Sequence, residues 1–434
     1  MVRPSRPRLA LIALLAGTAV AVASFFVYGA LTSSAYSSPP MPPVLAGFGE
    51  RSFRPGQVAS LAITSAHVRR VTLQLFLAGA VNGDAPIARQ PGWDDEIFGA
   101  PVTAPRLVPL RVHTTLPIHI PADWPSGDYV VRLTWPGHSD YAPFVLRPPR
   151  LGTVPVLVVE PTNTWHAYNA LNGDSWYMDD NVHVIGLAHP FAAAGTNGKP
   201  IPAGLPGQFR TLDVGFLRWF WQSGYRADFV SDDDLEAANL NELLRYRLIV
   251  FGGHEEYVTA YVYKLIRQYR DAGGNLAFLS ANSFYWRVVV HGNTMVGRTR
   301  WRDLGKPEAA LVGGQYVGWD DGGWPNKPYV VVDTAAAPWL FTGTGLHDGS
   351  TFGAYGIEID EPNAASPAGT KVVARIPNEF GSKDADMTIY RKGNSTVFNA
   401  GAMNFGASSH WPGISRMVSN LWSHLSGERP TLSR

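Results

Sequence analysis

Two patterns of apolar residues divide most of the chain. Between residues 44 and 149, short stretches that alternate apolar and polar positions are separated by turn residues such as proline, glycine and aspartate. The expected strands are residues 58–64, 71–76, 116–120 and 129–133. Short strands with frequent turns are typical of a β-sandwich. We therefore expect residues 44–149 to form an immunoglobulin-like or carbohydrate-binding-like sandwich domain.

A different pattern begins after residue 150, where continuous apolar runs alternate with amphipathic segments. The expected strands are residues 154–159, 226–230, 248–251, 275–279, 329–333, 371–376 and 395–399, and the expected helices are residues 211–223, 259–272 and 414–425. A continuous apolar run indicates a strand that is buried on both faces. Strands that alternate with helices indicate βαβ units. Residues 150–434 are thus predicted to form an α/β domain with a mostly parallel sheet.

The N-terminal segment has its own pattern. Three arginines among the first eight residues precede an uncharged run at residues 9–31. About 20 apolar residues span a bilayer, and a positive N-terminal flank stays in the cytoplasm. We expect residues 1–36 to hold a transmembrane anchor, followed by a proline-rich linker at residues 37–43, with the remainder extracytoplasmic at the cell membrane. Small residues at Ser33 and Ala35 leave a cleaved signal sequence, and so secretion, as the alternative.

Composition narrows the chemistry. The 434 residues carry a formal charge of +1 and no cysteine. Scattered basic residues give no reason to expect a nucleic-acid partner. The lack of cysteine excludes disulfides, thiol nucleophiles and zinc–thiolate sites. The sequence also contains no G-x-S-x-G elbow, P-loop or H-E-x-x-H motif.

Polar and aromatic loops follow three of the expected strands. They are residues 163–169, 254–256 and 281–286. Because the carboxyl ends of parallel strands meet at one edge of a sheet, these loops should line one crevice. Oxygen ligands such as Tyr168 and Glu256 suit a hard cation that activates water, and His254 would act as general base. The alternative is structural: His254 hydrogen-bonded, Tyr168 packed, and Glu255 pointing to solvent.

Several motifs resemble those of the large (β) subunit of N,N-dimethylformamidase and its relatives. They are N-T-W-H-A-Y-N at residues 163–169, G-G-H-E-E-Y at 252–257, G-G-N-L-A-F-L-S-A-N-S-F-Y-W-R at 273–287, P-E-A-A-L-V-G-G-Q-Y-V-G at 307–318 and F-N-A-G-A-M-N-F at 398–405. The resemblance implies a core like that of class I glutamine amidotransferases, without the nucleophilic cysteine.

The resemblance also implies a mononuclear iron held by two tyrosinates and a glutamate. A histidine and a second glutamate lie nearby in that family. On this basis Tyr168 and Glu256 are expected metal ligands, and His254 and Glu358 (in G-I-E-I-D) are expected catalytic residues.

The second tyrosine ligand departs from the family pattern. The family carries an R-P-Y-like sequence, whereas this chain has H-P-F, which ends at Phe191. If phenylalanine replaces a ligand there, metal binding weakens, because the remaining groups leave the first shell incomplete. Tyr177 is the alternative second ligand.

Two functions are therefore compared. The first is an envelope-anchored, metal-dependent amidase-like hydrolase of small amide C–N bonds, similar to N,N-dimethylformamidase. The second is a non-catalytic envelope protein that binds glycan or peptide through a degenerate amidase core. Either form is expected to take a small amide or glycan ligand, and to act as a homo-oligomer or with a small partner subunit.

Overall fold

The computed structural model describes most of the chain after the N-terminal segment. The described residues are 42–80, 88–89, 97–169, 171, 175–177, 181–188, 190–191, 204–320 and 325–430. The expected membrane anchor at residues 1–36 lies outside this set. Among the described residues, no helix combines the length and the apolar character that crossing a bilayer requires.

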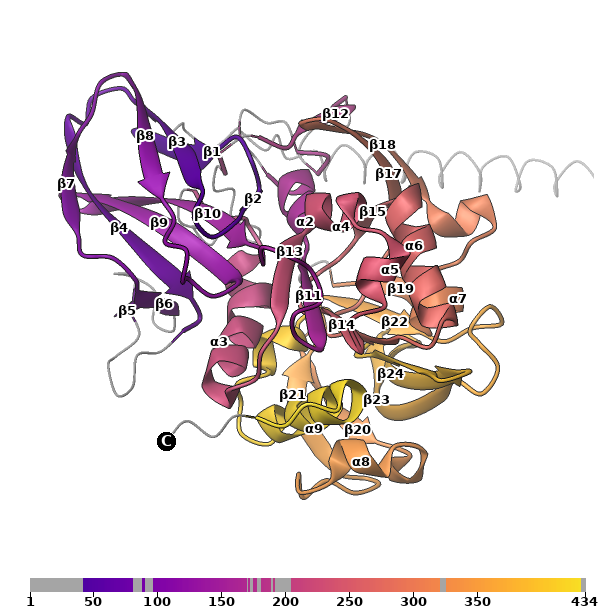
Figure 1. Ribbon diagram of the computed structural model, residues 1–434. Coiled ribbons are helices and arrows are strands. Elements are labelled where there is room, and N and C mark those ends of the chain that lie inside the picture. The colour runs from indigo at the N-terminus through magenta and orange to yellow at the C-terminus, as the bar shows by residue number, and fades with distance from the viewer. Residues whose placement is uncertain are drawn as a thin grey trace, which may run out of the picture. The chain divides into compact units, whose positions relative to one another are not determined.

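The N-terminal part of the described chain consists of two facing sheets (Figure 1). One contains β1 (Val44–Phe48), β3 (Val58–Ser65) and β8 (His113–His119); the other contains β2 (Ser52–Phe53), β10 (His138–Leu146), β9 (Gly127–Trp135), β4 (Arg70–Ala78), β6 (Ile97–Pro101), β5 (Ala88–Arg89) and β7 (Arg106–Pro109). In β3 exposed and buried residues alternate along the strand, as the pleat requires. Leu61, Leu73 and Phe144 belong to one buried cluster between the sheets. The domain boundary at residues 149–150 stays a prediction.

A nine-stranded sheet forms the centre of the remaining chain. Its order is β13 (Asp228–Ser231), β11 (Val156–Glu160), β14 (Leu248–Phe251), β16 (Asn275–Phe278), β25 (Ser395–Asn399), β24 (Lys383–Lys392), β23 (Lys371–Phe380), β20 (Lys327–Val331) and β21 (Thr351–Tyr355). The pairings from β13 to β25 are parallel. The pairings from β25 to β21 are antiparallel.

The predicted α/β class with a mostly parallel sheet is therefore wrong. Of the described residues, 40% are in strands and 21% in helices, and the strands form several sheets, of which the central one is mixed. Much of the discrepancy comes from β24, whose sequence K-D-A-D-M-T-I-Y-R-K hides a buried strand behind charged residues. Asp386 is buried there because the Arg375 guanidinium contacts its carboxylate at 2.6 Å. A buried acid with such a partner interrupts the apolar pattern on which the prediction relied.

Two smaller sheets accompany the central sheet among the described residues. One contains β12 (Val184–Gly186), β18 (Thr294–Arg300), β17 (Trp286–His291) and β15 (Tyr257–Thr259). The other pairs β19 (Gln315–Trp319) with β22 (Glu358–Glu361). Because β15 follows β14 directly, the small sheet extends from the strand end where the ionisable residues lie.

Helices cover both faces of the central sheet. They are α2 (Thr162–Ala167), α3 (Val214–Ser223), α4 (Asp232–Ala237), α5 (Leu240–Leu243), α6 (Ala260–Asp271), α7 (Ala309–Val312), α8 (Pro338–Phe341) and α9 (Ile414–Ser426). A π-helical turn, η3 (Phe209–Asp213), precedes α3. The buried side chains of α6 and α9 belong to different hydrophobic clusters, on opposite faces of the sheet.

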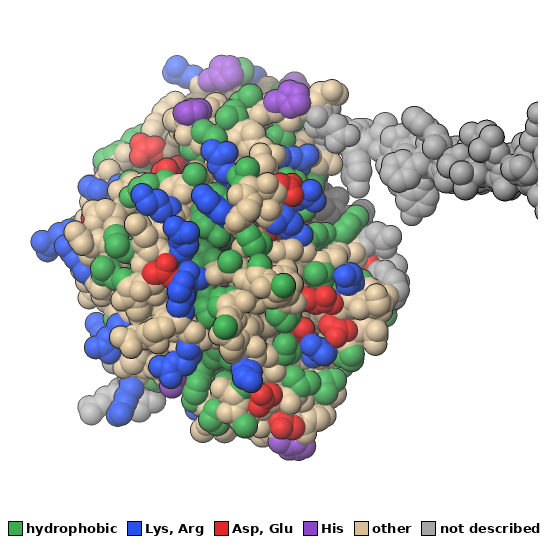
Figure 2. Space-filling view, turned by 90° about the vertical axis from the view of Figure 1, so that its right-hand side faces the viewer, with side chains coloured by type: hydrophobic (Ala, Val, Ile, Leu, Met, Phe, Trp, Pro, Cys, Tyr) green, Lys and Arg blue, Asp and Glu red, His purple; other side chains and the backbone are tan. Residues whose placement is uncertain are grey.

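On the side of the molecule that carries β17, β18 and α7, Lys and Arg side chains outnumber Asp and Glu (Figure 2).

Candidate active site

The loop after β14 is shaped by two glycines. A Cβ on Gly252 would lie 2.7 Å from the Phe216 ring, and a Cβ on Gly253 would lie 1.9 Å from Asp213 Oδ1. No larger residue fits without moving α3 and η3. This close approach carries His254, Glu255 and Glu256 into the interior, where each is at most 2% exposed.

Glu256 is the centre of a polar cluster. The Tyr168 and Tyr177 hydroxyls both donate to its Oε2 atom, each at 3.0 Å. Asn282 Nδ2 donates to Oε1 at 3.2 Å. The Glu256 backbone N–H donates to Thr164 Oγ1 at 3.0 Å, which ties this strand end to α2. Three protein oxygens thus meet at one point.

The two tyrosines reach this point from neighbouring parts of the chain. Tyr168 is the C-terminal cap of α2, which contacts β15 (Figure 1). Its ring stacks on that of Tyr177, with centroids 3.9 Å apart and planes 17° apart. The Tyr177 side chain is 43% exposed, but its hydroxyl is enclosed by Glu256 and by the Tyr257 hydroxyl, 2.5 Å away.

His254 lies near the same Glu256 oxygen as the two tyrosines, and next to a second carboxylate. Its Nε2 atom is 3.8 Å from Glu256 Oε2 and 3.4 Å from Glu358 Oε2. Its Nδ1 atom lies 3.2 Å from Gln208 Oε1, an acceptor, so Nδ1 carries the hydrogen and Nε2 has the lone pair in the neutral ring. Neither His254 Nε2 nor Glu358 Oε2 has a hydrogen-bond partner among the described residues.

Burial and mutual proximity shift these pKa values in the directions expected of a functional site. Burial raises the pKa of Glu256 to about 7, against the opposing effect of His254. Burial and the Glu256 carboxylate raise the pKa values of Tyr168 and Tyr177 well above that of a free phenol. Burial lowers the pKa of His254, but the Glu358 and Glu256 carboxylates outweigh it, and the pKa is raised above 6.5.

The donor set fits a hard metal ion. Both phenol oxygens lie 3.0 Å from Glu256 Oε2, and phenolate and carboxylate oxygens are the ligands that a hard cation would take. A cation at this point would favour ionised phenols, although burial alone opposes ionisation. Among the described residues, no group of three His, Asp or Glu side chains has metal-binding geometry, so such a site depends on the tyrosines.

The structure brings together all five residues that the sequence indicated: Tyr168, Tyr177, Glu256, His254 and Glu358. Sequence reasoning gave no role to Tyr257, Asn282 or Gln208. It did place Asn282 in the loop at residues 281–286, one of the three loops expected to line the crevice. The φ of Asn282, +53°, places it in the left-handed region, which asparagine tolerates better than most residues.

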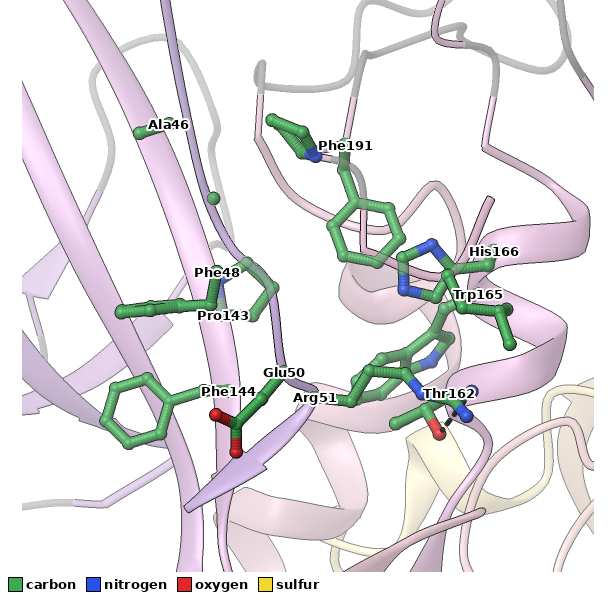
Figure 3. A pocket seen from close by; sticks show the side chains of 13 residues that line it. Ala46, Phe48, Glu50, Arg51, Pro143, Phe144, Thr162, Trp165, His166 and Phe191 are labelled. Carbon is green, nitrogen blue, oxygen red and sulfur yellow. Dashed lines mark hydrogen bonds between the residues drawn. The ribbon is translucent and has the colours of Figure 1, made fainter. Parts of the chain in front are cut away.

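Phe191 does not join the cluster. Its ring stacks on His166 with centroids 4.6 Å apart, and it lines a separate pocket between the sandwich and the core (Figure 3). The pocket is small, with a cavity volume of about 30 Å³, and is partly open to solvent. Opposite Phe191, the buried Arg51 guanidinium contacts Thr162 and Asn163. The position where a family ligand was expected therefore serves packing here.

Glu255 also differs from its expected position. The sequence suggested that it points to solvent, but it is 1% exposed. Its carboxyl group lies beside Asp232 and near Asp213 and Arg51. Burial and the neighbouring Asp232 carboxylate raise the pKa of Glu255 well above its usual range. Successive residues alternate in direction, and Glu255 faces away from Glu256.

Comparison with known proteins identifies the family of this chain. A family model described as N,N-dimethylformamidase beta subunit-like, C-terminal, matches residues 110–410. The chain belongs to this family. The matched segment contains every residue of the cluster around Glu256.

Individual relatives are distant. The N,N-dimethylformamidase beta subunit of an Alcaligenes species is 26% identical over 207 residues, which is 40% of this chain and 27% of the relative. The beta subunit from Paracoccus aminophilus is 26% identical over 209 residues, with the same coverage. The match therefore spans about a quarter of each relative's length. Among solved structures, the mmIFT52 N-terminal domain has a TM-score of 0.33 at 12% identity, covering 49% of this chain and 89% of that one.

Proposed function

We propose that this protein hydrolyses the C–N bond of a small amide at a metal ion held by Tyr168, Tyr177 and Glu256. The observation that carries the proposal is the meeting of two phenol oxygens with one carboxylate oxygen beside the lone pair of His254. Membership of the dimethylformamidase beta subunit-like family supports amide hydrolysis as the reaction. By the same likeness, the proposed metal is a single iron.

A metal ion in this position supplies Lewis acidity, which lowers the pKa of water and polarises a carbonyl oxygen. The protein's own residues manage the protons. His254 Nε2 accepts a proton from the attacking water and then returns it to the departing nitrogen, so that water is added across the C–N bond and an acid and an amine are released. The Glu358 carboxylate at 3.4 Å stabilises the imidazolium between these steps.

The second tyrosine is supplied by Tyr177 instead of the residue at position 191. The objection to metal binding was that phenylalanine stands at position 191. The support for Tyr177 as the second ligand is that its oxygen lies 3.0 Å from Glu256 Oε2. The remaining oxygen of Glu256 is held by Asn282, which fixes the carboxylate plane.

The two relatives are both named as beta subunits of N,N-dimethylformamidase, which supports the proposal that this chain also acts with a partner subunit.

The test is metal analysis combined with amide hydrolysis on the full chain. Purified protein loaded with iron is expected to bind about one ion per chain and to show a visible tyrosinate-to-iron charge-transfer band. Release of amine from N,N-dimethylformamide and from a panel of other small amides would then be measured. A colourless protein that binds no metal, hydrolyses no amide and binds oligosaccharide instead would overturn the proposal in favour of the binding module.

A further inference from the structure

Behind the proposed metal ligands lies a third tyrosine that the mechanism above does not use. Tyr257 is fully buried in β15. Its backbone N–H donates to Thr164 Oγ1, and its carbonyl accepts from Asn163 Nδ2. Its register with Trp286 of β17 fixes it further. The hydroxyl of this rigidly held residue touches the Tyr177 hydroxyl at 2.5 Å.

An arginine completes a chain of polar contacts that leads out of the site. Arg298 of β18 lies near the Tyr257 hydroxyl, and its positive charge opposes part of the rise that burial causes in the pKa of that hydroxyl. Its guanidinium lies over the Trp286 and Trp176 rings, 5.3 and 5.7 Å from their centroids. Both contacts favour a cation. Within the described part of the chain, Arg298 forms no ion pair with a carboxylate.

Donor chemistry gives this chain of contacts a direction. A guanidinium is a cation without an acceptor, so the Tyr257 oxygen turns a lone pair toward Arg298 and its single hydrogen points to Tyr177. The single hydrogen of Tyr177 then points to Glu256, as does that of Tyr168. A cation that replaces the Tyr177 and Tyr168 hydrogens finds the three oxygens already facing one another.

Tyr177 needs such support more than Tyr168 does. Tyr168 is anchored at the end of α2, with its backbone N–H bonded to Thr164 O. Tyr177 lies in a turn and is 43% exposed. Among the described residues it contacts the ring of Tyr168, the Ser175 side chain through its backbone N–H, and the Glu256 and Tyr257 side chains through its hydroxyl. Of the hydrogen bonds that its oxygen forms with described residues, only the one to Glu256 would remain without Tyr257.

We propose that Tyr257 and Arg298 are positioning residues for the metal centre: Arg298 orients the Tyr257 hydroxyl, which donates to the Tyr177 oxygen once that oxygen binds the cation. This inference rests on the proposed function. A hydrogen bond to a metal-bound phenolate withdraws charge from its oxygen and tunes the metal site, as outer-sphere partners do.

The test compares Tyr257→Phe with the parent protein, both as full chains loaded with ferric iron. Removing the hydroxyl makes the Tyr177 phenolate a stronger electron donor, so the charge-transfer band should move to longer wavelength. Iron affinity should fall about 10–100-fold, the usual cost of losing an outer-sphere partner. Tyr263→Phe is the matched control, because Tyr263 is also buried but stacks on Trp301 away from the cluster.

Arg298→Met and Arg298→Lys provide a second route if Tyr257→Phe does not fold. The Met variant should shift the band in the same direction, and the Lys variant, which keeps a charged donor, should restore part of the shift. If the parent shows the band but the Tyr257 and Arg298 variants match it in wavelength and affinity, the inference is wrong while the proposed function stands. A parent protein without metal or band overturns both.

Discussion

Two adjacent glutamates, Glu255 and Glu256, enter two buried acidic clusters that lie on opposite sides of the same loop. Glu256 faces phenol hydroxyls, a histidine and Glu358. Glu255 faces Asp232 and lies in a network that extends through Asp213 to Glu160. Both glutamates are at most 2% exposed. Burial and acidity therefore do not distinguish a reactive cluster from a structural one.

What differs is the group that compensates each charge. On the Glu255 side, the compensating group is the Arg51 guanidinium, which is fixed by an ion pair with Asp233. Because the Arg51 guanidinium already compensates negative charge there, that cluster does not need a metal ion. On the Glu256 side, the compensating groups are phenol hydrogens, which a metal ion can displace. The lesson is that exchangeable donors, rather than buried acids alone, mark a site prepared for a cation.

The largest expected effect comes from changing the two glutamates separately. Glu256→Gln should abolish stoichiometric iron binding, with at least a ~100-fold loss of affinity, because it removes an anionic ligand at the centre of the cluster. Glu255→Gln should keep its iron, because that side chain faces the other cluster. Metal analysis and thermal unfolding of both variants check this. Equal metal loss in the two variants would erase the distinction drawn above.

Exchanging phenol and phenyl rings at positions 177 and 191 sharpens the same comparison. Tyr177→Phe keeps the stacked ring but removes an oxygen 3.0 Å from Glu256, so iron affinity should fall by about 10–100-fold. Phe191→Tyr should leave iron affinity unchanged, because this ring lies against His166 in the separate pocket. Iron titrations followed by absorbance measure both. A gain of affinity in Phe191→Tyr would return the second ligand to that position.

The smallest effect concerns the far end of the structural network. Asp128 of the sandwich lies beside Glu160 of the core, and burial raises the pKa of Asp128 to about 7 from a usual 3.8. Between these pH values the unfolded chain releases a proton that the folded protein keeps, so folding stability should decrease as pH rises from about 4 to about 7. Asp128→Asn should flatten this dependence and stabilise the protein by ~1–3 kcal/mol at pH 8.

Denaturant unfolding at pH 5 and pH 8 measures the change in the free energy of unfolding for Asp128→Asn. The exposed Asp123→Asn, in the same part of the chain, is its control. If the free energy of unfolding of Asp128→Asn depends on pH as strongly as that of the parent protein, the protonation of Asp128 does not affect folding stability.

The sequence was informative where apolar patterns were uninterrupted. The strand at residues 248–251 and the helix at 414–425 were placed to within a residue. The motif after β14 led to His254 and Glu256, the motif at residues 163–169 led to Tyr168, and the family resemblance led to Glu358. The sequence failed for β24, because the ion pair of Asp386 with Arg375 conceals a buried strand. That strand belongs to the antiparallel half of the central sheet, which is why the fold class was missed.

Contacts between distant side chains were beyond the sequence. Nothing in the spacing of residues 177 and 257 indicates that their hydroxyls meet, and the direction of Glu255 depends on the exact course of the loop. The alternation that turns Glu255 and Glu256 apart was available in principle, but it required knowing that both sides of the loop are buried.

The arrival of the second phenol from the turn at Tyr177 has a consequence for searches among distant chains. A motif filter that demands a tyrosine at position 191 would discard this protein, although two phenol oxygens contact Glu256 here. A filter built on the paired glycines before H-E-E-Y, which no larger side chain can replace, would retain it and leave the source of the second oxygen to be found in three dimensions.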